Sequence, residues 1–110
     1  MVNKVEPLTE SYYYILLCLY NKANHGYGIM QDTLALSEGS VKIGSGTMYG
    51  ATSNMMKKGW IREKRSNSPA DERKRLYELT DFGKKILEGE MVRLKKLVES
   101  SERVIRGDLF

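Results

Sequence analysis

The sequence contains very little cysteine and histidine. Among its 110 residues there is one cysteine, Cys18, and one histidine, His25. A single cysteine excludes an internal disulfide framework and any metal site built from several thiolates. A single histidine leaves little for acid–base or metal chemistry, and no nucleophile–base pair or carboxylate pair with a plausible pocket can be picked out. We therefore expect no enzyme, no metal site and no cofactor.

Long apolar runs are also missing. The longest run, residues 12–20 (YYYILLCLY), is far shorter than the roughly 20 residues that a membrane-spanning helix needs. An acid and a proline precede it, which is unlike a signal peptide. There is no repeat, and Gly26-Tyr27-Gly28 is too short for a dinucleotide site. These absences predict a soluble cytoplasmic protein with no membrane partner.

The charge is present but unevenly spread. Residues 40–79 hold nine lysines and arginines against four acids, an excess of five, while the whole chain has a net charge of +4. The positive charge therefore belongs to one region, as expected for a protein that contacts nucleic acid. The length allows one domain with a modest core, so oligomerisation is an expected source of extra stability.

Residues 44–61 (GSGTMYGATSNMMKKGWI) are the stretch around which the chain is organised. Glycine and serine at its start suit a helix N-cap, and Lys57, Lys58 and Gly59 suit a helix end, so we expect a helix over residues 47–58. One face can enter a core through Met48, Ala51, Thr52 and Met55. The other face is small, hydrogen-bonding or basic, with Tyr49, Gly50, Ser53, Asn54 and Lys57. Alone, that face fits an ordinary solvated helix; with its neighbours, it fits insertion into the DNA major groove.

Two helices are expected before it. Thr9 can cap a first helix over residues 10–22. Its apolar run predicts burial on more than one side, and another subunit is a candidate to cover one of them. Within it, Cys18 suits a small core position better than a reactive thiol. A turn at residues 24–28 includes His25, and a second helix over residues 27–37 presents Ile29, Met30, Thr33, Leu34 and Leu36 as its apolar side. Residues 41–43 are compatible with a short strand. Helix, turn and helix with a polar outer face is the order of a helix-turn-helix unit.

After Gly59 the pattern changes from helical to alternating. Residues 60–65 and 73–79 alternate like two strands around the polar segment 66–72, which predicts a hairpin. A basic hairpin directly after a helix-turn-helix is a wing, and wings contact phosphate or the minor groove. Acids near the loop tip place the expected contacts on the stem, at Arg65, Arg73, Lys74 and Arg75.

The last helix is expected from Asp81 to about Val104, with Thr80 as its N-cap. Its apolar residues recur in steps of four and three: Leu87, Met91, Leu94, Val98, Ser101 and Ile105. This heptad-like stripe either folds back on its own domain or packs on a second copy. The helix length and the apolar first helix favour the dimer.

Five short motifs, in order over about residues 8–90, resemble the PadR family of winged-helix transcriptional regulators. Residues 8–19 are similar to that family's first helix, and residues 25–28 (HGYG) to its HGY-type turn. Residues 46–49 (GTMY) resemble a GTLY motif, and residues 58–61 (KGWI) a KGLI segment. Residues 73–80 (RKRLYELT), followed by Gly83, are similar to the wing strand that leads into the last helix. The length is similar to that of the short subgroup with a single C-terminal helix.

The resemblance implies a homodimer in which the long last helix of each copy pairs with the first helix of the other. It implies repression by operator binding, relieved by a small molecule in some members, and it makes residues 47–57 the recognition helix with Tyr49 as a phosphate or base contact. In some short members a tryptophan on the last helix holds planar drugs, but residues 81–110 contain none. A cavity against Tyr12, Tyr13 and Tyr14 is an alternative place for a small planar apolar effector, although core packing also explains these tyrosines.

We predict a mainly α fold with a small β-hairpin: a winged helix-turn-helix DNA-binding region at residues 1–80 and a C-terminal dimerisation helix at residues 81–110, within one compact domain. The predicted function is that of a dimeric, sequence-specific DNA-binding transcriptional regulator, a repressor of a palindromic operator. The alternative is a winged-helix module that binds protein and not DNA. The predicted DNA-binding residues are Ser45, Thr47, Tyr49, Gly50, Ser53, Asn54, Lys57, Arg65, Arg73, Lys74 and Arg75. The predicted dimer interface comprises Tyr12, Ile15, Leu16, Leu19, Leu87, Met91, Leu94, Val98 and Ile105.

Overall fold

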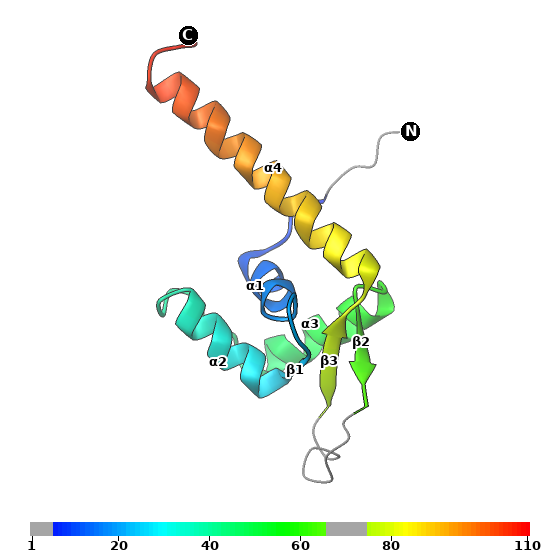
Figure 1. Cartoon of the computed structure of the whole chain (residues 1–110). Coiled ribbons are helices and arrows are strands. Elements are labelled where there is room, and N and C mark those ends of the chain that lie inside the picture. Colours follow the sequence, from blue (N-terminus) through cyan, green and yellow to red (C-terminus); the bar gives the residue numbers. More distant parts are fainter. Residues whose placement is uncertain (1–5, 66–74) are drawn as a thin grey trace.

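The computed structural model describes residues 6–65 and 75–110 (Figure 1). Along these residues the elements are α1 (Glu10–Cys18), β1 (Asn24–His25), α2 (Gly26–Leu36), α3 (Ser45–Lys57), β2 (Ile61–Lys64), β3 (Leu76–Leu79) and α4 (Asp81–Ile105). The predicted fold class, mainly α with a small hairpin, is confirmed. Among the described residues, no helix combines the length and apolar character needed to cross a membrane.

Helix α1 begins where the sequence predicts and ends earlier. The Thr9 hydroxyl accepts a hydrogen bond from the backbone N–H of Tyr12 at 3.1 Å, so Thr9 is the N-cap. The expected end at Lys22 is wrong, because the helix stops at Cys18. The N–H groups of Leu19 and Tyr20 bond to carbonyls three residues back, which tightens the chain into the turn before β1.

The hydrophobic core lies where α1, α2, α3, the hairpin and the first half of α4 meet. Ile15 and Leu16 of α1, Ile29 of α2 and Met55 of α3 are fully buried in it. Ile15, Leu16, Leu19 and Leu87, which the sequence analysis assigns to the dimer interface, are buried within the single chain. Side chains buried within their own chain have no surface left to cover with a partner.

The apolar side of α2 is narrower than its sequence predicts. Ile29 and Thr33 are buried and Met30 is half-buried, but Leu34 and Leu36 near the helix end are exposed. Cys18 packs against the core and its thiol lies 3.6 Å from the Thr33 hydroxyl, as expected for a small core residue. Burial raises the pKa of this thiol, which keeps it in the less reactive protonated form.

The sheet has three antiparallel strands in the order β1-β3-β2. Strands β2 and β3 form the predicted hairpin stem, with Ile61 opposite Leu79 and Lys64 opposite Leu76. Strand β1 was not predicted: Asn24 and His25, expected only as a turn, pair with Tyr77 and Leu76 of β3. The short strand expected at residues 41–43 is absent, and that part of the chain runs without regular structure into α3.

A compact turn joins α3 to the hairpin. Gly59 has a positive φ of 76°, its N–H bonds to the Met56 carbonyl, and the Trp60 N–H bonds to the Met55 carbonyl. This is a Schellman motif, and it confirms the helix end predicted from Lys57, Lys58 and Gly59. This turn fixes the direction in which the chain leaves α3 and places Trp60 at the base of the wing.

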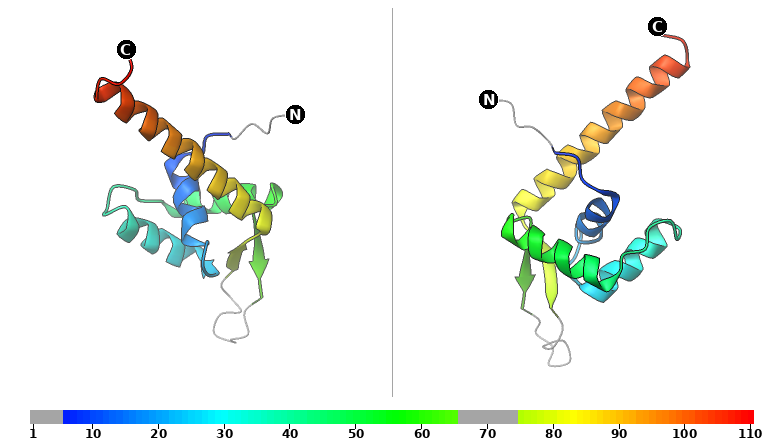
Figure 2. Two further views of the ribbon diagram at one scale, coloured as in Figure 1. Left: turned by 45° about the horizontal axis from the view of Figure 1, so that its top comes forward. Right: turned by 180° about the vertical axis from the view of Figure 1, so that it is seen from behind.

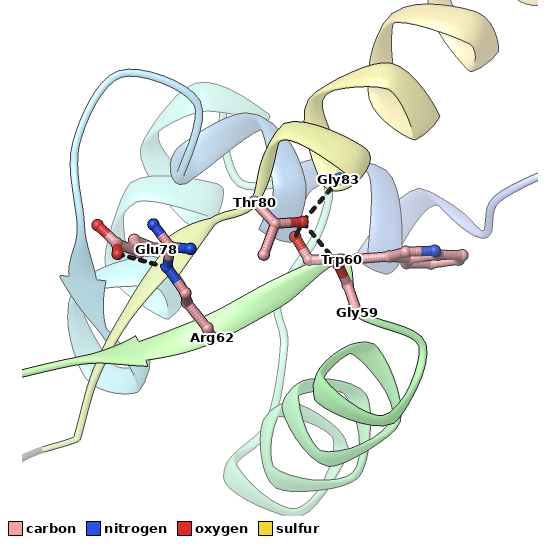
Figure 3. A network of polar contacts seen from close by, with 6 residues as sticks. All are labelled: Gly59, Trp60, Arg62, Glu78, Thr80 and Gly83. Atoms are coloured by element: carbon pink, nitrogen blue, oxygen red, sulfur yellow. Dashed lines mark hydrogen bonds and ion pairs between the residues drawn. The ribbon is translucent and has the colours of Figure 1, made fainter.

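Thr80 ties this turn to the start of α4 (Figure 3). Its hydroxyl lies 2.6 Å from the Gly59 carbonyl oxygen and accepts a hydrogen bond from the Gly83 N–H at 3.0 Å. The Thr80 N–H in turn donates to the Trp60 carbonyl oxygen at 3.0 Å. A side chain at position 83 would overlap that same carbonyl, so glycine is required there. The predicted N-cap is confirmed, and it also fixes where α4 leaves the hairpin.

Helix α4 runs far beyond the rest of the molecule. In each view its C-terminal half extends away from the other elements (Figures 1 and 2). The radius of gyration is 16.4 Å, whereas a compact chain of this size has about 13 Å. Beyond Leu87, the apolar residues of the predicted stripe are exposed within the single chain: Met91, Leu94, Val98 and Ile105.

Candidate nucleic-acid interface

Helix α3 has the two faces that its sequence predicts. Met48, Ala51, Thr52 and Met55 are buried against the rest of the domain. On the other side Tyr49 is 69% exposed, and Gly50 and Lys57 are also exposed. The helix begins at Ser45, two residues before the predicted start, with Gly44 as its N-cap. Ser45 and Thr47 therefore lie in its first turn, both exposed.

The structure brings three predicted DNA-binding residues to one place. Ser45 and Tyr49 of α3 and Arg75 beside β3 line an open pocket of about 400 Å³, together with the start of α2. A helix start, a phenol and a guanidinium around one hollow can contact phosphate and base edges at the same time. The end of the hairpin stem that carries Arg75 and the N-terminal half of α3 thus form a single surface.

The same pocket includes residues that the sequence did not single out as DNA contacts. Tyr27, in the first turn of α2, is exposed and lines the same pocket as Tyr49. Its hydroxyl accepts a hydrogen bond from the Gln31 side-chain amide at 2.8 Å, so its own proton remains available to an acceptor outside the helix. The spacing of Tyr27 and Gln31, four residues apart on one helix, is the sequence signal that would have drawn attention to this pair.

Asn54 lies on a different side of α3 from Tyr49. At about 100° per residue it sits about 140° around the helix from Tyr49. It is half-buried, and its side-chain amide donates a hydrogen bond to the Tyr12 hydroxyl of α1 at 3.0 Å. The prediction that Tyr49, Ser53, Asn54 and Lys57 project together therefore needs correction for Asn54. Its side-chain amide is hydrogen-bonded to α1.

The stem of the wing is basic, but two of its arginines are paired within the hairpin. Arg62 on β2 contacts Glu78 on β3 at 2.8 Å (Figure 3), and Arg75 contacts Glu63 at 3.3 Å. The hydrogen bond from Arg62 lowers the pKa of the Glu78 carboxyl, so this cross-strand pair stays ionised. Arg65, at the outer end of β2, is exposed. Of the predicted wing contacts, Arg73 and Lys74 lie outside the described residues.

Comparison with known proteins identifies the family of this chain. The profile of the transcriptional regulator PadR-like family matches residues 15–89, which is more than half of the chain. No curated protein sequence matches this chain significantly.

Several solved structures share the fold. A PadR family transcription regulator from Clostridium difficile is 26% identical, with a TM-score of 0.72, over 88% of this chain and 99% of that one. A Streptococcus mutans protein is 22% identical, with a TM-score of 0.70, over 97% and 98% of the two chains. A transcriptional regulator from Clostridium thermocellum is 22% identical, with a TM-score of 0.65, over 91% and 90%. The last two likenesses concern the fold alone.

Proposed function

This chain belongs to the PadR-like family of transcriptional regulators, and from that premise we propose that it is a dimeric repressor that binds a palindromic DNA operator in the cytoplasm. The family consists of regulators and not of enzymes, in line with the expectation from the sequence. The proposed division of labour is a DNA-binding region at residues 1–80 and a dimerisation helix at residues 81–110, within one domain.

The observation that carries this proposal is the outer face of α3 beside the pocket at its start. Tyr49 projects from α3 with more than two thirds of its surface exposed, next to Ser45, Tyr27 and Arg75. An exposed aromatic residue on a two-faced helix, with hydroxyl and guanidinium groups around it, matches the chemistry of a duplex groove and its phosphates. Ser53 and Lys57 extend that surface along the helix, Gly50 lies at its edge, and Thr47 is a further proposed contact in the exposed first turn of α3.

The proposed dimer is supported by the exposed apolar stripe of α4. Met91, Leu94, Val98 and Ile105 share one side of α4 and are exposed, so the other described residues do not cover them. Water-exposed apolar surface of this length is typical of an interface between subunits. Tyr12 on α1 remains a candidate interface residue because it is only half-buried. Release of the operator by a small planar apolar effector is also part of the proposal.

The test is selection of the DNA that the purified protein retains, followed by titration of that operator by fluorescence anisotropy. Tyr49→Ala should weaken operator binding by about 5- to 150-fold, since a specific base contact is worth about 1–3 kcal/mol. Phe110→Ala removes another exposed aromatic side chain, at the far end of the chain, and is the matched control. Equal affinities for all three proteins would move the interface away from α3.

A winged-helix module that binds protein remains the alternative, supported by the ion pairs that neutralise Arg62 and Arg75 in the hairpin stem. DNA binding through phosphates must weaken steeply as salt rises, because bound counterions are released. Binding to duplex DNA that is absent, or that does not respond to salt, would favour the alternative.

A further inference from the structure

Helix α4 carries the proposed dimer interface on its outer half and is attached to the rest of the chain by its first half. Within the part of the chain that the structure describes, its hydrogen bonds to residues 6–80 all come from residues 81–90. Leu87 in the same stretch is buried in the core, and the stripe from Met91 onward is exposed. The contacts along residues 81–90 therefore fix the direction in which α4 leaves the proposed DNA-binding region (Figure 1).

One of these contacts comes from Tyr20, in the turn that follows α1. Its hydroxyl donates a hydrogen bond to a carboxylate oxygen of Glu88 at 2.6 Å. The Lys84 ammonium, one turn earlier on α4, lies 5.9 Å from the centre of the same ring. The hydrogen bond to Glu88 raises the pKa of Tyr20, so the hydroxyl stays protonated and remains a donor. Tyr20 thus links the end of α1 to the side of α4 that carries Lys84 and Glu88.

The opposite end of α1 is linked to α4 by Glu90, which accepts the backbone N–H of Leu8 at 2.8 Å. At about 100° per residue, Glu88 and Glu90 lie about 160° apart around α4. Helix α1 therefore lies against the first half of α4 with one hydrogen-bonded contact on each flank (Figure 2). The apolar contact at Leu87 between them is non-directional, so the two flanking contacts are needed to fix the angle of α4.

The angle of α4 matters in a dimer because it decides how far apart the two recognition helices stand. The molecule is 60 Å long, and a third of that length gives an arm of about 20 Å. A swing of about 10° over such an arm moves its end by about 3.5 Å, close to the rise of one base pair. A contact that prevents this swing therefore determines the separation of the two half-sites to within about one base pair.

We propose that Tyr20 is a positioning residue for the operator: its hydrogen bond to Glu88 fixes the direction of α4 and thereby selects the half-site spacing that the dimer accepts. The selection of a spacing rests on the proposed function, whereas the fixed direction of α4 does not. An operator that is one base pair too long or too short is bound only when the Tyr20–Glu88 hydrogen bond is strained or broken. The strength of this bond is therefore part of the penalty for the wrong spacing.

The direction of α4 is tested first, without DNA. Spin labels at Lys42→Cys and Ser100→Cys, both exposed positions, report the distance from the DNA-binding region to the outer half of α4 in a Cys18→Ser background. The labelled full-length protein is diluted with an excess of unlabelled protein, so that pulsed electron paramagnetic resonance sees one labelled copy at a time. Tyr20→Phe should broaden the distance distribution by about 2–3 Å, because Ser100 lies about 15 Å beyond Glu90 along the helix and swings with it.

Tyr14→Phe is the matched control for the lost hydroxyl. Tyr14 lies on α1, and its hydroxyl makes no hydrogen bond to another described residue, so this variant should keep the narrow distribution. A distribution that is equally narrow in wild type and Tyr20→Phe would overturn the proposal.

The spacing is then tested on the selected operator and on versions lengthened or shortened by one base pair between the half-sites. Wild type should prefer the selected spacing by at least about tenfold, because one base pair also turns the second half-site by about 34°. Tyr20→Phe should lower this ratio to about threefold or less, since a hydrogen bond to a charged group is of the same order as the penalty. Its affinity for the selected spacing should change by less than about threefold.

Variants of the acceptor separate positioning from general stability. Glu88→Ala should lower the spacing ratio as Tyr20→Phe does, whereas Glu88→Gln keeps an acceptor oxygen and should keep the wild-type ratio. Glu99→Ala removes the same charge from an exposed position on the outer half of α4 and should also keep it.

The outcomes distinguish this inference from the proposed function. A wild-type spacing ratio in Tyr20→Phe, or an equal loss of affinity at every spacing, would overturn the positioning role. A wild type that binds all three spacings equally would overturn it too. If the wild type binds no operator, the proposed function and the selection of a spacing both fall, and the label distances alone decide whether Tyr20 fixes the direction of α4.

Discussion

Glu90 is a carboxylate buried to 1% exposure in the middle of α4. Both oxygens accept hydrogen bonds from Arg93, at 2.6 and 2.8 Å, and one also accepts the backbone N–H of Leu8 at 2.8 Å. These donors explain how a charge is tolerated there, because a buried acid without partners is costly. They also attach the chain before α1 to α4.

Glu90→Gln should therefore destabilise the protein by about 1–3 kcal/mol at pH 7, the usual cost of weakening a buried charged hydrogen bond. The hydrogen bonds from Arg93, opposed by burial and assisted by Leu8, lower the pKa of Glu90. A lowered pKa in the folded state means that this stabilisation is present above the unfolded value, about 4.3, and is lost as the pH falls through the folded value. Urea unfolding of wild type and variant should show a gap that closes below about pH 4. A gap that is constant with pH would exclude this role for the charge.

Glu38 shows strain at a single backbone position. It follows α2 with a φ of 53°, in the left-handed region, where the next N–H, of Gly39, bonds back to Leu34. A residue with a side chain costs about 1–2 kcal/mol in this conformation, and glycine avoids that cost but loses some chain entropy. Glu38→Gly should raise the free energy of unfolding by about 0.5–1 kcal/mol. Glu38→Ala keeps the strain and should give no gain; equal stabilisation by both would trace the effect to the lost charge.

At the scale of elements, the wing is a hairpin in which some charged side chains form ion pairs with each other. Arg62 is held by Glu78 across the strands, whereas Arg65 is exposed at the outer end of β2. A residue that neutralises a phosphate contributes about one unit to the slope of log K against log salt. Arg65→Ala should reduce the magnitude of that slope by about one on operator DNA, and Arg62→Ala by clearly less. The same slope for wild type and both variants would show that the wing stem does not contact DNA phosphates.

The elements also show which features can be predicted from a sequence alone. The caps Thr9, Gly59 and Thr80 act within a few residues, so their types and spacing were sufficient. The inner face of α3 followed from helical spacing for the same reason. Strand β1 was missed because it is two residues long and exists only through its pairing with β3, which lies more than fifty positions along the chain. The end of α1 was misplaced because the apolar run continues beyond it.

The candidate site was predictable to a similar extent. The exposure of Tyr49 follows from its position on a two-faced helix. The Asn54–Tyr12 bond and the Arg75–Glu63 pair join segments distant in sequence, and no local pattern encodes them. Ile15, Leu16 and Leu19 were assigned to an interface because an apolar residue looks the same in a sequence whether its own domain or a partner covers it. Only the packing of α1 against the other helices distinguishes the two.

The whole molecule is an elongated body, and the other described residues leave the apolar stripe on the outer half of α4 exposed. Its longest extent is 60 Å, and α4 supplies much of that length (Figure 2). One recognition helix reads only a few base pairs. Two copies related by a two-fold axis would place two such helices on half-sites roughly 34–36 Å apart, or a multiple of that distance. In the proposed regulator, tight DNA binding thus depends on the exposed stripe of α4, although the stripe itself does not contact DNA.

Leu94→Asp tests this arrangement. Leu94 is 37% exposed in the single chain and lies mid-stripe with Val98, so in the dimer each copy would bury an unpaired carboxylate at a cost of several kcal/mol. The variant should sediment as a monomer and lose most of its operator affinity, although its α3 is chemically unchanged. Ser100→Asp makes the same change in charge at an exposed position off the stripe and should keep both dimer and affinity. Circular dichroism of Leu94→Asp should remain helical, because this position lies beyond the core. A Leu94→Asp protein that stays dimeric and binds operator normally would show that the stripe is not the interface.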